Sequence, residues 1–223
     1  MKILAFETST ELCSAALWLD GGVDAREANA GQRHSELLLP MIDELLVSHS
    51  LKAAHLDCIA FGAGPGAFTG LRIACGVAQG IAFGSNVPVV GVSTLLALAA
   101  ASRADHVVCC LDARMGEVYH AAYERRGGGW HAVHEPGLCK PDAVPELPDG
   151  AWAGCGSGFC VYRKALASRY AGTLARVIDD LMPHAREIAA LAAAEFGRGG
   201  AVSAELAAPL YVRNKVALRM DER

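Results

Sequence analysis

The sequence predicts an α/β fold made of two similar lobes, and three observations support this. Short apolar runs typical of strands alternate with helix-like segments along the 223 residues. The order strand, short loop, strand, glycine turn, strand and helix occurs twice, about a hundred residues apart. Each copy opens with an apolar strand that ends in a carboxylate, Glu7 in the first and Asp112 in the second. Chance similarity between two mixed halves is the alternative to an internal duplication.

The first half is expected to form one lobe. The segment Asp20-Gly21-Gly22 is typical of the tight turn of a β-hairpin. Apolar runs bounded by turn residues predict strands over residues 2–7, 13–19, 23–29, 56–62 and 88–92. Helical spacing of apolar residues predicts helices over residues 35–48 and 69–84, and a short one that ends near residue 101.

The second half repeats this order with less regular spacing. Strands are predicted over residues 106–112, 117–124, 130–135 and 151–154. Helices are predicted over residues 159–168 and 184–197. We therefore expect an N-terminal lobe at residues 1–101, a second lobe at residues 102–200, and a tail at residues 201–223 that packs back on the first lobe.

Composition and charge exclude several classes of function. Apolar residues make up 52% of the chain and charged residues 20%, which is typical of a globular protein. The formal net charge is −4, so tight binding to nucleic acid by this chain alone is not expected. No apolar run reaches the roughly 18 residues that a membrane span needs. The eight cysteines include no Cys-x-x-Cys pair, which indicates buried thiols in a reducing compartment, the cytoplasm.

The most informative segment is the glycine-rich stretch at residues 62–72, GAGPGAFTGLR. It follows a strand and opens a helix, where glycines permit close backbone approach and helical N–H groups can hold an anion. It also matches the Gly-x-Gly-x-x-Ala pattern of dinucleotide-binding loops. Pro65 removes one N–H donor, however, and residues 84–91 offer no acidic side chain for a ribose hydroxyl. A tight turn with Thr69 as the helix cap is the alternative.

Two neighbouring helices carry more apolar residues than one sheet-facing stripe requires. Between residues 71 and 84 only Arg72 and Gln79 are polar, and glycine recurs every four residues from Gly76. A surplus on both helices predicts a helix-bundle contact with another chain. The residues expected at this contact are Leu38, Met41, Ile42, Leu45, Ile73, Val77 and Ile81. Burial within the same chain is the alternative.

Few residues offer catalytic chemistry. Glu7 and Asp112 end equivalent strands, a placement that resembles the Mg²⁺-binding carboxylates of two-lobed phosphotransferases. Asp112 can instead form an ion-paired loop with Arg114 and Glu117. The histidines include no His-x-x-x-His pair, and the chain has no Gly-x-Ser-x-Gly segment. The residue types alone therefore predict no metal site and no nucleophile.

Several strings of the sequence resemble the bacterial TsaB (YeaZ) family. They are ILAFETST at residues 3–10, HSE at 34–36 with Leu39-Pro40, GPGAFTGLR at 64–72, DARMGEVY at 112–119 and PLYVR at 209–213. The two internal strings are specific, and the resemblance covers the whole chain. The motif residues are Gly64, Pro65, Gly66, Phe68, Thr69, Gly70, Arg72, Asp112, Arg114 and Glu117.

The resemblance implies the ASKHA fold, which is actin-like with two RNase H-like lobes, in agreement with the duplication. It implies a part in forming N6-threonylcarbamoyladenosine at position 37 of tRNAs that read codons starting with A. In such systems a TsaD-like subunit transfers the threonylcarbamoyl group, and a TsaE-like ATPase joins the complex. TsaB-like proteins pair with TsaD through their two N-terminal helices. We expect a homodimer when that partner is absent, and only indirect contact with tRNA.

The chain departs from TsaD-like proteins at the metal ligands. Where those proteins carry Gly-Val-Asn-His-x-x-x-His, this chain has GVSTLLAL at residues 91–98. Thr94 and Leu98 occupy the ligand positions, and leucine cannot bind a cation. We therefore expect a non-catalytic scaffold without cofactor or metal. The alternatives are a small ATP- and Mg²⁺-dependent phosphotransferase that uses Glu7 and Asp112, and a metalloprotease, which would require bound zinc or iron.

Overall fold

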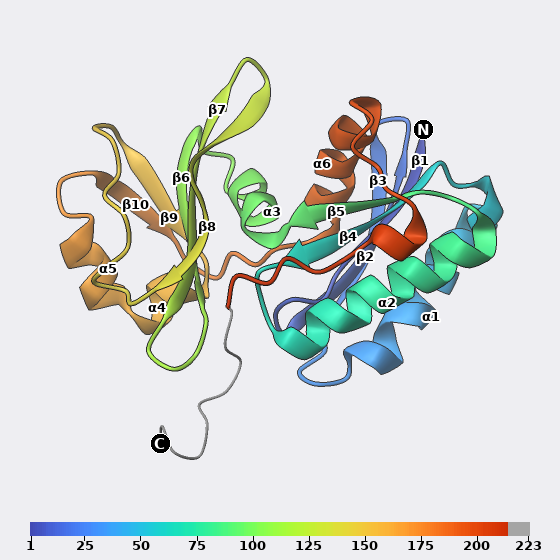
Figure 1. Cartoon of the computed structure of the whole chain (residues 1–223), viewed down its shortest axis with the longest axis horizontal. Helices are drawn as coiled ribbons and strands as arrows, with labels where there is room; N and C mark the ends of the chain where they lie inside the picture. Colours follow the sequence, from blue (N-terminus) through green and yellow to red (C-terminus); the bar gives the residue numbers. More distant parts are fainter. Residues whose placement is uncertain (214–223) are drawn as a thin grey trace.

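The computed structural model describes residues 1–213 and contains two five-stranded sheets (Figure 1). The first sheet has the order β3-β2-β1-β4-β5, with β1 (Lys2–Glu7), β2 (Leu12–Leu19), β3 (Gly22–Asn29), β4 (Cys58–Gly64) and β5 (Val89–Ser93). The second sheet has the order β10-β9-β6-β7-β8, with β6 (His106–Asp112), β7 (Val118–Arg126), β8 (Gly129–Cys139), β9 (Trp152–Cys155) and β10 (Leu174–Ile178).

Six α-helices and two short 3₁₀ turns complete the described part of the chain. The helices are α1 (His34–Ser48), α2 (Phe68–Ser85), α3 (Thr94–Ala101), α4 (Ser157–Val161), α5 (Arg163–Arg169) and α6 (Ala185–Gly197). The 3₁₀ turns are η1 (Ala53–His55) and η2 (Ala204–Leu206). None of these helices is both long enough and apolar enough to cross a bilayer.

The two sheets share one topology. In each, the first three strands pair antiparallel, the fourth pairs parallel with the first, and the fifth pairs parallel with the fourth. This confirms the predicted α/β fold of two similar mixed sheets. Strand β10 was not predicted, because its five residues, LARVI, lie at the edge of the sheet and carry Arg176 in place of a continuous apolar run.

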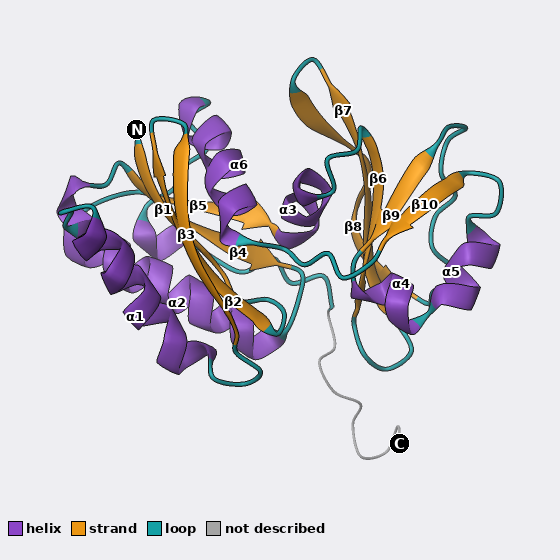
Figure 2. Ribbon diagram, turned by 180° about the vertical axis from the view of Figure 1, so that it is seen from behind, coloured by secondary structure: helices purple, strands orange, loops and turns teal. Residues whose placement is uncertain are grey.

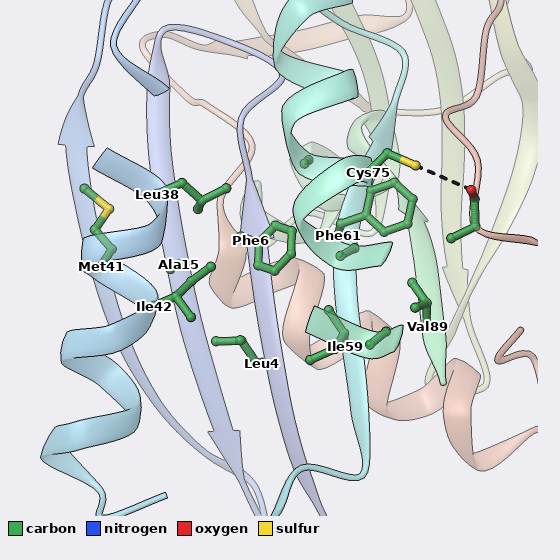
Figure 3. Close-up of a cluster of buried hydrophobic side chains, with 14 of the residues drawn as sticks. Leu4, Phe6, Ala15, Leu38, Met41, Ile42, Ile59, Phe61, Cys75 and Val89 are labelled. Carbon is green, nitrogen blue, oxygen red and sulfur yellow. Dashed lines mark hydrogen bonds between the residues drawn. The ribbon is translucent and has the colours of Figure 1, made fainter. Parts of the chain in front are cut away.

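Both faces of the first sheet are buried, and the alternation of side chains along β1 shows how. Leu4 and Phe6 point to the face covered by α1 and α2, while Ile3 and Ala5 point to the opposite face (Figure 3). The second face is covered by α6, whose Ile188 joins the same core cluster (Figure 2). Alanines dominate this second cluster on both sheet and helix, which allows the helix to approach the sheet closely.

Helix α6 belongs to the first lobe, although the predicted boundary at residue 200 placed it in the second. Its first N–H, at Ala185, donates to Ser14 Oγ over 3.0 Å, and His184 Nε2 lies 2.6 Å from Glu27 Oε2. Its apolar face matches the open face of the first sheet, whereas α3 and α4 already cover the second sheet. The chain therefore crosses back between the lobes before residue 185.

The segment after α6 also lies against the first lobe. Val202 exchanges two backbone hydrogen bonds with Val89 and so covers the outer edge of β5. Further along, the carbonyl of Ala207 accepts a hydrogen bond from Cys75 Sγ of α2 (Figure 3). It also accepts one from Gln79 Nε2 of the same helix. Residues 214–223 of the predicted tail lie outside the described residues.

Helix α3 lies between the two sheets and contributes to both cores. Ala97 packs with the alanine-rich cluster of the first lobe, and Leu95 and Leu98 pack against the second sheet. The helix is capped by Ser93, whose Oγ accepts a hydrogen bond from the N–H of Leu96. The second sheet is closed on its other face by α4 and α5, through Phe159 and Leu166.

Two adjacent leucines of α1 provide a matched test of this packing. Leu38 is 0% exposed in the first core, whereas Leu39 is 53% exposed. We expect Leu38→Ala to lower the free energy of unfolding by about 2–5 kcal/mol, because it leaves a cavity that the core cannot fill. We expect Leu39→Ala to change it by less than about 0.5 kcal/mol in the isolated chain. Urea unfolding followed by circular dichroism measures both, and similar losses for the two variants would contradict this account.

Candidate functional site

The inward face of α1 packs against its own sheet and does not form the predicted contact with a partner. Leu38, Met41, Ile42 and Leu45 are at most 9% exposed and pack against the first sheet (Figure 3). Burying each large apolar side chain is worth about 1.5–3 kcal/mol, so the richest stripe of the helix turns to its own sheet. The prediction that these four residues contact another chain is therefore wrong for this fold, and the alternative of internal burial holds for them.

The outer face of α1 nevertheless keeps apolar side chains. Leu39 and Val47 are exposed, and their spacing of eight residues places them in one row along the helix. Charged groups share this face: Asp43 is exposed between Leu39 and Val47 in the same row. Glu44, one turn before Val47, pairs with Arg26 of β3 over 2.6 Å. The outer face of α1 therefore carries two separated apolar side chains among carboxylates.

Helix α2 presents a surface with little side-chain cover. Gly76, Gly80 and Gly84 form one exposed row, and no heavy atom lies within 4 Å of a Cβ built on any of them. Phe83, at 82% exposed, lies beside this row. Ile73, Val77 and Ile81 are half-buried and pack on the edge of the first core. We define the helix-pair surface as Leu39, Val47, Ile73, Gly76, Val77, Gly80, Ile81, Phe83 and Gly84.

The glycine-rich string has a packing role at the start of α2. A Cβ on Gly70 would collide with the carbonyl oxygen of Thr8, and one on Gly66 would collide with Ser9. Thr8 Oγ1 donates to the carbonyl of Gly70 over 2.8 Å, and the N–H of Ala67 donates to the carbonyl of Ser9. The glycines therefore let the β1–β2 loop press against the helix, which agrees with the tight-turn alternative. Thr69 does not cap α2; its N-cap residue is Ala67.

The second string forms the predicted ion-paired loop only in part: Asp112 pairs with Arg114, whereas Glu117 pairs with Arg213 outside the loop. Asp112 Oδ1 accepts hydrogen bonds from the N–H of Arg114 at 2.9 Å and from the hydroxyl of Tyr162 at 3.1 Å. Its Oδ2 lies 3.0 Å from the Arg114 guanidinium. The loop closes on itself, because the N–H of Ala113 donates to the carbonyl of Glu117. Asp112 thus uses both carboxylate oxygens within the protein.

The third string joins the other two across the lobes. We call residues 209–213 the strap. Leu210 N–H donates to the carbonyl of Ala63 over 2.7 Å, and Arg72 Nε donates to the Tyr211 hydroxyl over 3.2 Å. On the second lobe, Arg213 lies 2.8 Å from Glu117 and donates to the carbonyl of Ala113 over 2.9 Å. Three strings that are far apart in the sequence therefore meet at one place (Figure 1).

A cleft of about 990 Å³ lies between the lobes at this junction. The β1–β2 loop, the start of α2, the loop after β6 and the strap line it. At its mouth the Arg72 guanidinium lies over the Phe68 ring, 3.9 Å from the ring centroid. Asp112 and Glu117, the two acidic groups of the loop after β6, are both paired with arginines.

Glu7 is placed where it cannot share a metal ion with Asp112 in the cleft. It is 0% exposed and does not line the cleft. Its Oε1 accepts the N–H of Ser9 at 2.6 Å, and Thr94 Oγ1 donates to its Oε2 at 3.3 Å. Burial raises the pKa of Glu7, and the hydrogen bonds from Ser9 and Thr94 only partly oppose this shift. Glu7 therefore supports the core of the fold.

The two positions that correspond to the metal ligands of TsaD-like proteins are also buried. Thr94 and Leu98 are both 0% exposed, the first bonded to Glu7 and the second packed in the second lobe. Within residues 1–213, no three His, Cys, Asp or Glu side chains are grouped so as to hold a metal ion. Sequence reasoning missed Phe83 and the strap contacts of Tyr211 and Arg213. Phe83 could have been found as the one aromatic residue in the glycine- and alanine-rich stretch at residues 76–84.

A family model and two curated relatives match nearly the whole chain. Residues 20–218 match the family model described as TsaD, tRNA N6-adenosine threonylcarbamoyltransferase. The chain is 38% identical to the tRNA threonylcarbamoyladenosine biosynthesis protein TsaB of Escherichia coli K12, over 97% of this chain and 96% of that protein. It is 34% identical to the protein of the same name from Haemophilus influenzae, over 97% and 95% of the two chains.

Solved structures give the same assignment. A crystal structure described as an uncharacterized Pseudomonas aeruginosa protein with similarity to peptidase YEAZ has a TM-score of 0.88 and 37% identity, and covers 95% of this chain and 99% of its own. A structure of YeaZ from Pseudomonas aeruginosa has a TM-score of 0.85 and 36% identity, with 94% and 99% of the two chains covered. The chain therefore belongs to the TsaB (YeaZ) family, within the wider TsaD family whose model it matches.

Proposed function

We propose that this chain is a non-catalytic subunit that binds and positions a TsaD-type transferase during formation of N6-threonylcarbamoyladenosine. The modified nucleoside lies at position 37 of tRNAs that read codons starting with A, and the reaction takes place in the cytoplasm. A TsaE-type ATPase joins through the complex. The helix-pair surface binds the transferase, and two copies of this chain associate through it when the transferase is absent.

The observation that carries the proposal is the exposure of the helix-pair surface. Two large apolar side chains are exposed on neighbouring helices, Val47 at 68% on α1 and Phe83 at 82% on α2, where Phe83 lies beside a row of exposed glycines. Exposed apolar patches rimmed by polar groups mark protein contacts, and glycine rows let a second helix approach closely. A stable contact of this kind buries about 1,600 Å² in total, which two long helices from each partner supply.

The carboxylates that a catalyst would need are engaged in contacts within the chain, which favours a supporting role. Both candidate carboxylates have partners within the chain: Glu7 is buried beneath the cleft and Asp112 is held by Arg114 and Tyr162. The net charge of −4 gives the isolated chain no electrostatic drive toward RNA. Contact with tRNA is therefore supplied by the partner subunits.

Reconstitution tests the proposal directly. The TsaD-type and TsaE-type subunits, threonylcarbamoyl-adenylate and tRNA are combined with and without this chain, and the modified nucleoside is measured by mass spectrometry. We expect modification only when the chain is present, together with co-purification of the chain and the TsaD-type subunit. Equal modification without the chain, or modification of tRNA by the chain alone, would contradict the proposal.

The helix-pair surface can be tested with charged variants. We expect Leu39→Glu and Phe83→Glu each to raise the Kd for the TsaD-type subunit by more than about tenfold, because an unpaired charge would be buried in the contact. Isothermal titration calorimetry measures the effect. Ala175→Glu, on the exposed edge strand β10 of the second lobe, adds the same charge elsewhere and is expected to leave the Kd unchanged. Wild-type affinity for both helix variants would rule out this surface.

The Glu7→Gln variant distinguishes a structural role of Glu7 from the catalytic role that the phosphotransferase alternative gives it. Its pKa is raised in the fold, so folding favours the protonated form. The stability that protonated Glu7 contributes is fully present below the pKa of about 4.5 that it has in the unfolded chain. It is lost as the pH rises through the higher pKa of Glu7 in the folded protein. We therefore expect Glu7→Gln to increase the melting temperature at pH 7.5, with a smaller gain at pH 4.5, and to leave tRNA modification intact.

Scanning calorimetry across this pH range measures the stability of the Glu7→Gln variant. Thr94→Val is a matched control, since it removes the hydroxyl that donates to the Oε2 atom of Glu7 without changing any charge. If Glu7→Gln instead abolished an ATP hydrolysis activity of the purified wild-type chain, the phosphotransferase reading would replace the structural one.

A further inference from the structure

A second cavity lies on the other side of the strap and outside the helix-pair surface. Its volume is about 460 Å³, it is open to solvent, and it is lined by the β7–β8 hairpin, the start of α3 and Leu210 of the strap. The residues that matter here are Ser93, Leu96, Tyr123, Trp130, Glu135 and Pro136. Among the lining residues only Leu210 belongs to a motif string, and none belongs to the helix-pair surface, so an inference from this cavity does not depend on the proposed function.

The register of the hairpin explains how these side chains share one face. Tyr123 pairs with Ala132, and Trp130 lies two residues away on the same strand, so both aromatic rings are on the side of the hairpin that faces α3. Residue Ala122 pairs with His134, which leaves an extra residue in β8 between the two pairs. A second register shift follows between Ala122 and His120, and Glu135, which lies within it, lines the cavity together with Tyr123.

The chemistry of the cavity is that of an apolar slot with one negative group. Leu96, Pro136 and Leu210 supply apolar wall, and Trp130 and Tyr123 supply aromatic rings. Tyr123 is a neutral hydroxyl, since burial raises its pKa, and its oxygen lies 3.5 Å from Ser93 Oγ. The carboxylate of Glu135 is exposed and makes no ion pair or hydrogen bond with any residue in the range 1–213.

We propose that this cavity binds an alkylammonium or alkylguanidinium group, as carried by a lysine or arginine side chain. The alkyl stem packs on the apolar wall, and the cationic head lies between the partly exposed ring of Trp130 and Glu135. Aromatic rings attract cations through their electron-rich faces, and a nearby carboxylate adds charge complementarity. Arg125, opposite Trp130 in the register, is exposed and does not line the cavity, and it is the neighbouring charge that opposes binding.

The test compares two probes with the same stem in the full chain. N-acetyl-lysine methylamide carries the cation, and N-acetyl-norleucine methylamide lacks it. Binding is followed by two-dimensional ¹H–¹⁵N NMR at the indole N–H of Trp130, assigned with Trp130→Phe. We expect a saturable shift with the lysine probe and at least about fivefold weaker binding of the norleucine probe. Cadaverine serves as a third probe, and stronger binding than the lysine probe identifies a free polyamine as the source of the cation.

Variants assign the preference to named groups. Glu135→Gln is expected to remove the fivefold preference for the cation, whereas Arg125→Gln is expected to increase it by removing the like charge. Asp149→Asn removes a carboxylate from an exposed loop of the same lobe and is expected to change nothing. The proposal is overturned if the two probes bind equally, if neither shifts Trp130, or if Glu135→Gln keeps the wild-type preference.

Discussion

The burial of the first sheet on both faces is the constraint on which the rest of the structure depends. Alternation along β1 sends Leu4 and Phe6 to one face and Ile3 and Ala5 to the other. Neither face can be left in water, because apolar burial supplies most of the stability of a domain. In the N-terminal half, α1 and α2 cover only one of these faces, and α3 adds little more than Ala97 to the other. The chain must therefore return from the second lobe with α6, and this return ties the two lobes together.

The same constraint decides which surfaces stay open. Once α1 and α2 have turned their richest stripes to the sheet, their outer faces retain a few large apolar groups and a row of glycines. The cleft between the lobes also remains, but arginines already pair with the acidic groups of the loop after β6, and Glu7 lies beneath the cleft in the core. The two carboxylates that the sequence offered for a Mg²⁺ site, Glu7 and Asp112, are thus engaged in structural contacts.

Local sequence patterns predicted where helices and strands lie, but not which face of a helix meets the sheet. Local patterns located nearly every helix and strand, and the Asp20-Gly21 turn has the positive φ angles expected of a hairpin. The stripe of Leu38 and Leu45 was identified correctly as one face of a helix, but its direction was not. Helical periodicity shows which residues share a face, and two neighbouring helices with surplus apolar surface do not show which face meets the sheet. The half-buried Ile73, Val77 and Ile81 remain part of the proposed contact.

By itself the sequence determined the repeated order of elements, the glycine turns and the family strings, because each depends on residues close together in the chain. Tertiary structure decided which lobe α6 covers, how Arg72, Glu117 and Arg213 come together through the strap, and how the register shifts between β7 and β8 place Glu135 in the lining of the cavity. These features depend on pairings between residues that are far apart in the sequence. Such pairings form only when the whole sheet and the helices that cover it pack together.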